Sequence, residues 1–422
     1  MNFNKFSGAA RAVNLLTLAA LIGLLPACGG GSGTSANTPT PATATPPATT
    51  TPAATTPAAA SNTQVITIDA GPANTVNTLF TSVTVCVPGS ATACQTIDHV
   101  QIDTGSVGLR LLSSVVQPSL KLPQKAAADG NALVECTQFA DGYSWGPVKS
   151  ADIRLGGQTA IAVPIQIIGD ASFTDIPLAC SSSGPPENTV RDFGANGILG
   201  IGSFANDCGN ACVGGINHGI YYACSSAGCV PTTVSATAQV QHPVAALTTD
   251  NNGVVLQLPS IPAAGAGGAT GTMILGIGTR SNNALGSARV HTLDATDATL
   301  TVTLDGKAYT GSFIDSGSNG YFYPSTATRI CSSGFFCPPS PLTVATVIQG
   351  KNGTNTAYNF TITNADALFG DNPGFTAFPT LGGQGFDNTA VDLGLPFFFG
   401  RSVFTAIEGR STPAGVGPYV AF

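Results

Sequence analysis

Charged residues are scarce in this sequence. Asp, Glu, Lys and Arg make up 9% of the 422 residues, and the formal net charge is −7. The 15 Lys and Arg residues form no run or stripe, which excludes a nucleic-acid partner of the usual basic kind. Apolar residues at helical spacing are scarce too, and 240–247 and 325–330 are the better candidates for short helices. A mainly helical protein is therefore excluded.

Turn-forming residues and short apolar runs are abundant instead. The chain contains 51 Gly and 29 Pro, well above the roughly 12% that these residues contribute to an average protein. Between them lie runs with strand-type alternation, such as VITIDAG, HVQID, ADIRLGG, ATLTVTL and YNFTIT. Many short strands separated by turns predict an all-β fold.

The N-terminus has the features of an export signal. Basic residues accompany an apolar stretch at 12–25 that is too short to span a bilayer, which predicts a signal peptide over residues 1–27. The stretch ends in LLPAC, which resembles a bacterial lipobox, so Cys28 would carry a lipid. The Gly that follows would direct the protein to the outer membrane, on its periplasmic or surface face. Because Pro is unusual inside a lipobox, ordinary signal-peptide cleavage, giving a periplasmic or secreted protein, stays open.

Residues 28–62 form a Thr/Pro/Ala-rich segment without a single charge. Such a segment cannot bury a core, so we expect a flexible to semi-extended tether. It would link a lipid at Cys28 to a folded region that begins near residue 63. The lipid is the only membrane contact that the sequence predicts.

Cysteine usage supports export. The sequence contains 11 Cys, and setting Cys28 aside leaves ten, enough for five disulfides in an oxidising compartment. The spacing favours the bridges Cys86–Cys94, Cys331–Cys337 and Cys136–Cys180. Pairing in sequence order and nested pairing are both open for Cys208, Cys212, Cys224 and Cys229. Their spacing lacks the two Cys-x-x-Cys knuckles of a structural zinc site, so we expect no metal and no other cofactor.

One short motif occurs twice. HVQIDTGSVGLRL contains Asp103 and SFIDSGSNGYFYP contains Asp315, and each places Asp at the end of an apolar run. Each is followed at a distance by an apolar stretch with Gly, ANGILGIGSF in the first case and DLGLPFFFG in the second. Two motifs repeated in the same order predict two lobes of related topology, at residues 63–260 and 261–422.

The repeated motif can form a site for acid–base chemistry. Two carboxyls a few ångströms apart cannot both ionise at low cost, so Asp103 and Asp315 would share one proton. They would then supply a general base and a general acid for the attack of water on an amide carbonyl. Glycines let the two loops approach closely, and small hydroxyls hold the carboxyls in place. These supporting residues are Thr104, Gly105, Ser106, Ser316, Gly317 and Ser318.

These motifs, together with ANGILGIG, GTMILGIGTRSNNALGSARVHTL and DLGLPFFFGRSVFTAIEG, resemble those of pepsin-like aspartic peptidases from about residue 64 to the C-terminus. With the lipobox in front, the resemblance implies a bacterial lipoprotein that is a member of this bilobal all-β family. Two barrel-like lobes would enclose an active-site cleft. It also implies a monomeric aspartic endopeptidase that cleaves peptide or protein substrates with apolar side chains around the scissile bond. By the resemblance, Asp103 and Asp315 are catalytic, Thr104 and Ser316 link the loops, and Ser106 and Ser318 contact the outer carboxylate oxygens.

The resemblance further implies a hairpin that closes over the substrate, within CTQFADGYSWGPVKSADIRLGG. Its candidate substrate-binding residues are Phe139, Gly142, Tyr143 and Trp145. Phe139 stands where the family carries Tyr, so Tyr143 or Trp145 would have to replace that hydroxyl-bearing ring. Arg110 likewise stands where many members carry Trp. These departures leave open a second function, a catalytically inactive binding or surface module on the same scaffold.

Overall fold

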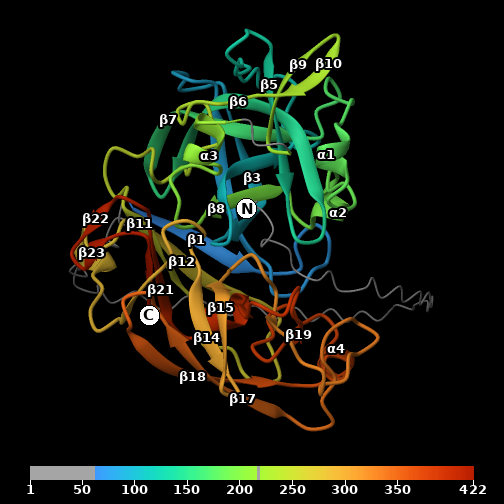
Figure 1. Cartoon of the computed structure of the whole chain (residues 1–422), viewed down its shortest axis with the longest axis vertical. Helices are drawn as coiled ribbons and strands as arrows, with labels where there is room; N and C mark the ends of the chain where they lie inside the picture. Colours follow the sequence, from blue (N-terminus) through green and yellow to red (C-terminus); the bar gives the residue numbers. More distant parts are fainter. Residues whose placement is uncertain (1–61, 216–218) are drawn as a thin grey trace, which may run out of the picture. The chain divides into compact units, whose positions relative to one another are not determined.

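The computed structural model describes residues 62–215 and 219–422. Strands account for 42% of the residues and helices for 7%, so the chain has the all-β fold that the sequence predicts (Figure 1). The predicted signal peptide, the lipidation at Cys28 and the tether up to residue 61 lie outside the described residues. The described residues belong to one compact unit, and the lobe boundary at residue 260 stays a prediction.

Most strands belong to one large sheet. Its strands are β1 (Thr63–Ile68), β2 (Leu79–Cys86), β3 (Cys94–Asp103), β4 (Val107–Leu112), β5 (Ala132–Gln138), β6 (Tyr143–Leu155), β7 (Gln158–Ile168), β8 (Gly197–Ile201), β9 (Tyr221–Ser225), β10 (Gly228–Pro231), β11 (Gly253–Gln257), β12 (Ala269–Leu275), β13 (Val290–Thr292), β21 (Ser402–Ala406) and β24 (Tyr419–Ala421). They follow one another in space in the order β10-β9-β5-β6-β7-β4-β8-β3-β2-β1-β12-β11-β21-β24-β13.

A second sheet comes from the C-terminal part of the chain. It contains β14 (Leu300–Leu304), β15 (Lys307–Ile314), β16 (Tyr321–Tyr323), β17 (Leu342–Gln349), β18 (Asn355–Ile362), β19 (Gly382–Gln384) and β20 (Asp392–Leu393). Their spatial order is β18-β17-β14-β15-β20-β16-β19. The remaining elements are the hairpin β22 (Ser411–Thr412) and β23 (Gly415–Val416), the short helices α1 (Leu178–Ser181), α2 (Val190–Phe193), α3 (Asn210–Val213) and α4 (Ala365–Asp371), and the 3-10 turns η1 (Ser281–Asn283) and η2 (Leu395–Phe398).

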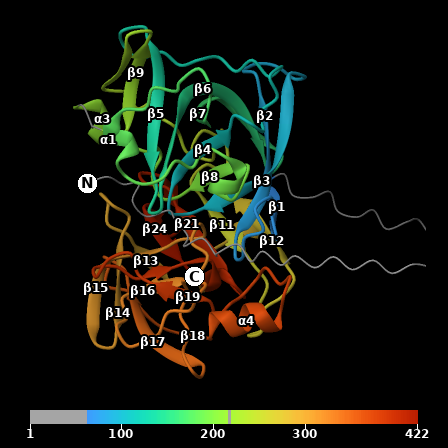
Figure 2. The ribbon, with the colours of Figure 1, turned by 90° about the vertical axis from the view of Figure 1, so that its right-hand side faces the viewer.

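Six strands of the large sheet close into a barrel. β2 pairs with β6 as well as with β3, so the ring β2-β3-β8-β4-β7-β6 has no free edge. Along β3, the side chains of Ile97, Val100 and Ile102 are buried on the inner face of the barrel. Ile97 and Val100 can share this face because the strand register shifts near His99, which has a φ of 46°. Figure 2 shows β3, β4 and β8 side by side in this barrel. The apolar run that precedes Asp103 is therefore a core strand.

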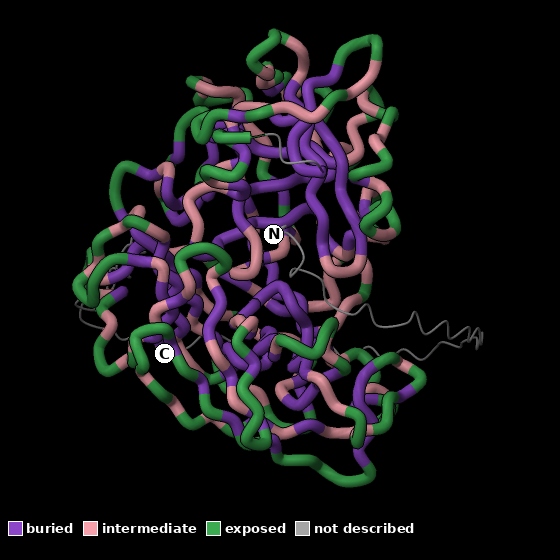
Figure 3. Tube along the Cα trace, in the orientation of Figure 1, coloured by how far each residue is buried: buried purple, intermediate pink, exposed green. Residues whose placement is uncertain are grey.

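The second sheet forms a half-barrel. Along β17, Val344, Thr346 and Ile348 are buried and the residues between them are exposed, as expected where one face of an antiparallel sheet meets the core and the other meets solvent. Figure 3 shows the same contrast between buried inner strands and exposed outer loops. The structure thus contains one closed barrel and one half-barrel, where the sequence predicted two barrel-like lobes.

The two Asp motifs occupy the same local topology. β3 pairs in parallel with β8, and β4, which follows the first Asp loop, pairs with the same β8 in antiparallel fashion. β15 pairs in parallel with β20, and β16, which follows the second Asp loop, is antiparallel to β20. Each loop is therefore fixed on both sides to one central strand. The central strands β8 and β20 belong to the two Gly-containing apolar stretches that follow the motifs in the sequence.

All ten cysteines of the described residues form disulfides. Cys86–Cys94, Cys136–Cys180 and Cys331–Cys337 pair as predicted. The four remaining residues pair in sequence order, as Cys208–Cys212 and Cys224–Cys229, so their sulfurs are not available as zinc thiolates. Several disulfides indicate an oxidising, exported compartment. Within the described residues, no helix is long and apolar enough to span a membrane.

The prediction of two short helices, at 240–247 and 325–330, is wrong, because both segments form turns. At 325–330, Ser325 Oγ accepts a hydrogen bond of 3.2 Å from the amide of Thr328. At 240–247, His242 Nδ1 accepts a hydrogen bond of 3.1 Å from the amide of Val244. Side chains that bond to nearby backbone amides offer an alternative to helical hydrogen bonds, and here they replace a helix.

Candidate functional site

Asp103 and Asp315 meet in the interior of the folded unit. Each stands at the end of its strand, directly before the loop that leads to β4 or β16, and each side chain is 0% exposed. The two carboxyls lie within hydrogen-bonding reach of each other. Two acidic residues far apart in the sequence therefore form one buried carboxyl pair.

Hydrogen bonds cross between the two loops in a symmetric pattern. The amide of Thr104 donates to Ser316 Oγ (3.1 Å), and the amide of Ser316 donates to Thr104 Oγ1 (2.9 Å). Thr104 Oγ1 in turn donates to the carbonyl of Ile314, and Ser316 Oγ donates to the carbonyl of Ile102. Each hydroxyl thus serves as donor and acceptor across the junction, which fixes both carboxyl-bearing loops relative to one another.

The glycines after the two Asp residues make the close approach possible. The amide of Gly105 donates to Oδ1 of both Asp103 (2.7 Å) and Asp315 (3.1 Å), and the amide of Gly317 donates to Asp315 Oδ1 (2.8 Å). A Cβ at Gly105 would lie 2.8 Å from Asp315 Cγ, and one at Gly317 would lie 2.6 Å from Asp103 Oδ1. Both distances are too short for real carbon atoms, so only glycine fits at either position.

Gly317→Ala is expected to separate the two carboxyls, because its new methyl group would overlap Asp103 Oδ1. Overpacking of this kind lowers the free energy of unfolding by about 1–3 kcal/mol. Thermal unfolding of the full chain would measure this loss. Gly267→Ala is the matched control, because its Cβ would enter open space. Equal behaviour of the two variants would contradict the close approach described here.

The electrostatics of the pair favour a shared proton. The pKa of Asp315 is raised well above its usual value, chiefly by burial and then by the charges of Asp103 and Asp392. Asp103 Oδ2 has no hydrogen-bond partner among the described residues. A buried oxygen without a donor is a suitable place for a shared proton or for a water molecule. One neutral and one ionised carboxyl at this place can act as acid and base.

The supporting serines differ from each other. Ser318 Oγ donates to Asp315 Oδ2 at 2.9 Å, which matches its predicted place at an outer carboxylate oxygen. Ser106 Oγ is buried without a hydrogen-bond partner among the described residues, so its expected contact with Asp103 is not formed. The Ser106 hydroxyl is therefore available to a ligand or to water.

A cavity lies against the loop that carries Asp103. Its volume is about 70 Å³, enough for several water molecules. Thr104, Gly105 and Ser106 form one part of its wall. The rest of the wall mixes apolar residues with polar ones: the apolar residues are Val107, Phe204, Leu293, Ala298, Phe313, Ile314 and Val420, and the polar residues are Ser203, Asp207, Asp297, Thr299 and Thr405. The cavity therefore has a mixed lining, in which apolar side chains lie among hydroxyl and carboxyl groups.

The predicted flap hairpin exists as β5 and β6, but its candidate residues pack elsewhere. Phe139 lies edge-to-face on the ring of Phe193. Trp145 donates from Nε1 to the carbonyl of Phe173 and packs edge-to-face on the ring of Tyr222. Tyr143 is buried in the same apolar cluster as Trp145, and Gly142 contacts the segment around Glu187. The structure does not bring these residues to the carboxyl pair. The rings of Tyr143 and Trp145 lie in the core beside the Cys136–Cys180 disulfide, and the ring of Phe139 lies in a separate apolar cluster.

Arg110 takes part in a buried polar network next to the first Asp loop. Its guanidinium is 1% exposed and donates to Glu135 Oε1 (2.6 Å), Asp207 Oδ2 (3.2 Å), Thr137 Oγ1 and the carbonyl of Val107. Tyr221 also donates to Asp207. The bond to Val107 fixes the strand that leaves the loop. Arg110 therefore anchors the loop of Asp103 to β5.

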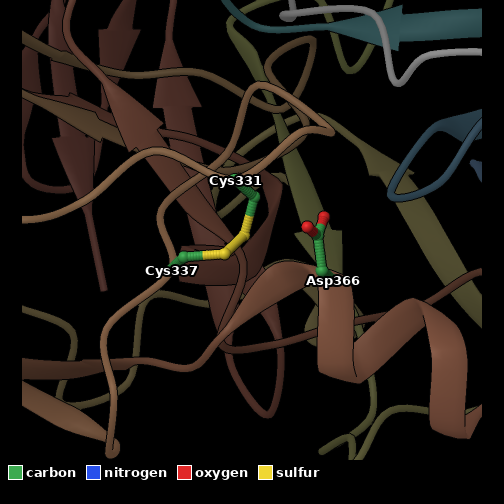
Figure 4. Close-up of side chains that lie close together, drawn as sticks. All are labelled: Cys331, Cys337 and Asp366. Carbon is green, nitrogen blue, oxygen red and sulfur yellow. A yellow bond between two sulfur atoms is a disulfide. The ribbon is translucent and has the colours of Figure 1, made fainter.

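One further cluster of metal-ligand residue types occurs in the described part of the chain, at Cys331, Cys337 and Asp366 (Figure 4). The two sulfurs are bonded to each other and cannot act as thiolate ligands. The Asp366 carboxylate accepts hydrogen bonds from the amide and hydroxyl of Ser332. This cluster is accounted for by local structure.

Sequence reasoning missed one acidic residue at the centre. Asp392, in β20, is 2% exposed, and its charge raises the pKa of Asp315. The sequence contained a signal for it. The stretch DLGLPFFFG begins with Asp, whereas the corresponding part of the first stretch, GILG within ANGILGIG, contains only apolar residues and Gly.

Fold and site together define an all-β protein with a buried, interlocked carboxyl pair. The family model described as "Protein of unknown function (DUF3443)" matches residues 58–422, and the chain belongs to this family. A search of curated proteins found no match. The resemblance to pepsin-like aspartic peptidases was therefore wrong as an assignment of family. Its motifs are short and consist of Asp, Thr, Ser and Gly, which any tight loop at a strand end favours, so they describe a local geometry and not a lineage.

Proposed function

We propose that this protein is an aspartic-type endopeptidase, in which Asp103 and Asp315 activate a water molecule for hydrolysis of a peptide bond. The observation that carries the proposal is the carboxyl pair itself. Two buried acids accept hydrogen bonds from the same backbone amide, that of Gly105. Such a pair holds one proton between two sites and can give and accept protons in one step.

The proposed reaction uses the pair in both protonation states. The ionised carboxylate takes a proton from water as the water oxygen bonds to the carbonyl carbon, and the neutral carboxyl gives its proton to the carbonyl oxygen. The resulting diol collapses when its hydroxyl proton returns to the pair, the leaving nitrogen accepts the other proton, and the C–N bond breaks. The products are an acid and an amine, and the pair regains its single proton.

The substrate we propose is an extended peptide or protein segment with apolar side chains around the scissile bond. Support comes from the apolar side chains, among them Phe204, Leu293 and Phe313, that contribute to the wall of the cavity beside the Asp103 loop. We further propose that residues 63–260 and 261–422 are two related lobes with the substrate between them. The matched pairing of the Asp loops with β8 and β20 supports this arrangement.

The proposed location is outside the cytoplasm, with the monomeric protein held on the outer membrane by a lipid on Cys28. The five disulfides support an oxidising compartment. Metabolic labelling with a radioactive fatty acid, in the wild type and in Cys28→Ala, would test the anchor. Label in both proteins, or in neither, would contradict it.

A second candidate function is a binding or surface module that does not cleave its ligand. Two observations favour it: neither carboxyl is exposed, and the aromatic residues of the β5–β6 hairpin lie in the core. Such a module would use the Ser106 end of the cavity to hold a peptide without hydrolysis.

The deciding experiment incubates the full chain with an unfolded protein substrate between pH 3 and pH 7 and identifies new peptide termini by mass spectrometry. New termini that are absent with Asp103→Ala and Asp315→Ala support the endopeptidase. Binding of peptides without new termini at any pH would overturn the endopeptidase in favour of the binding module.

A further inference from the structure

Asp392 occupies a place in the second sheet where an ionisable residue is unexpected. It lies on β20, the central strand between β15 and β16, opposite Phe313 on one side and Phe322 on the other. Its side chain is 2% exposed, and neither carboxyl oxygen forms a hydrogen bond of ordinary geometry within the described residues. A buried carboxyl without a donor is strongly destabilised in its ionised form.

The register of the first motif shows which residue type this position otherwise carries. Asp392 stands opposite Phe313, two residues before Asp315, and Ile198 stands opposite Gln101, two residues before Asp103. On the other side, both residues pair with the position seven residues beyond the Asp. Ile198 and Asp392 are therefore structural counterparts, and the second copy replaces an apolar side chain by a carboxyl.

The groups that face Asp392 are mainly acidic. Burial raises the pKa of Asp392, the Ser318 hydroxyl offsets part of this rise, and the charge of Asp103 adds to it. Asp315 follows the paired strand β15, and its own pKa is raised by Asp392. On β16, the hydroxyl of Tyr321 is engaged with that of Tyr358. None of Asp103, Asp315 and Asp392 forms an ion pair among the described residues, so three carboxyls lie in one buried region without a salt bridge.

We propose that Asp392 is a third carboxyl of the centre. It is a positioning residue that sets the pH up to which Asp315 keeps the shared proton. The catalytic part of this inference rests on the proposed function. When Asp392 ionises, its negative charge disfavours ionisation of Asp315, so the pair keeps its single proton at higher pH. Asp392 thereby extends the working range of the pair on the alkaline side.

A stability measurement tests the buried carboxyl without any assay of cleavage. A carboxyl whose pKa is raised in the folded state stabilises the protein fully below its unfolded pKa, near 4, and that stability is lost as the pH rises. Asn has no such titration. The Tm of Asp392→Asn minus the Tm of the wild type is therefore expected to increase by about 3 °C or more between pH 4 and pH 7.

Two further variants separate charge from packing. Asp392→Ile copies Ile198 and is expected to show the same pH-dependent gain as Asp392→Asn. Asp371→Asn removes an exposed carboxyl and is expected to leave the Tm profile unchanged. A Tm difference between Asp392→Asn and the wild type that stays constant from pH 4 to pH 7 would overturn the inference, because a purely structural role of Asp392 does not depend on pH.

A cleavage assay is the second test of the role of Asp392. In the full chain with Asp392→Asn, the alkaline limb of the pH–activity profile is expected to move to lower pH by about one unit, while the acid limb changes less. An active variant with an unmoved alkaline limb would overturn the inference. If no cleavage occurs in any variant but the Tm trend is present, the third carboxyl stands and the endopeptidase proposal fails.

Discussion

Replacement of either Asp103 or Asp315 by Asn is expected to reduce peptide hydrolysis by about 1,000-fold or more, with little loss of folded protein. Asn keeps the size of the side chain and can still accept the amide of Gly105, but it cannot hold or transfer the shared proton. Turnover of an unfolded protein substrate by the full chain is the measurement. Circular dichroism and Tm would establish that each variant is folded.

The double variant Asp103→Asn/Asp315→Asn provides the internal control. Residues that act as one unit are strongly non-additive, so the double variant should be about as inactive as either single variant. Multiplicative losses in the double variant would show that the two carboxyls act independently. Retention of more than about a tenth of wild-type turnover in a single variant would contradict the proposed role of the pair.

Arg110→Met is expected to produce the largest loss of stability, about 3–5 kcal/mol in the free energy of unfolding. Met has similar length but leaves Glu135 and Asp207 buried without their counter-charge. The pKa of Asp207 is already raised, chiefly by burial and then by Glu135, and Arg110 opposes this rise. Without Arg110 that pKa rises further, so the loss should be small near pH 4 and grow as the pH increases. Urea denaturation at pH 4 and pH 7 measures it.

Two controls accompany this prediction. Arg191→Met removes an exposed Arg and should change the free energy of unfolding by less than about 0.5 kcal/mol. The triple variant Arg110→Met/Glu135→Gln/Asp207→Asn removes all three charges and should recover most of the lost stability, since the penalty comes from unpaired buried charge. A triple variant as unstable as Arg110→Met would show that packing, and not charge, is what Arg110 supplies.

Local features of the fold were accessible from the sequence because they depend on near neighbours. Alternating apolar runs predicted strands, and three of the five disulfides were identified by their spacing. The same local reasoning failed at 240–247 and 325–330, where side-chain bonds to the backbone replace the helix. It also failed to pair Cys208, Cys212, Cys224 and Cys229, since spacing alone permits both arrangements.

Part of the candidate site could be predicted from the sequence. The duplicated motif identified Asp103 and Asp315, and the symmetric bonds of Thr104 and Ser316 follow from residues that the motif contains. The role of Arg110 was not accessible, because its partners come from β5 and from the segment after β8. Local sequence placed Tyr143 and Trp145 in a hairpin, and the tertiary structure turned their rings into the core.

The sequence by itself determined the all-β class, the repeated Asp loops and the glycines that each loop needs, because these depend on the chemistry of a few consecutive residues. The tertiary structure decided that one sheet closes into a barrel and the other stops at a half-barrel, and that Asp392 joins the carboxyl pair. Both outcomes depend on which strands become neighbours, and strand pairing is set by burial across the whole fold.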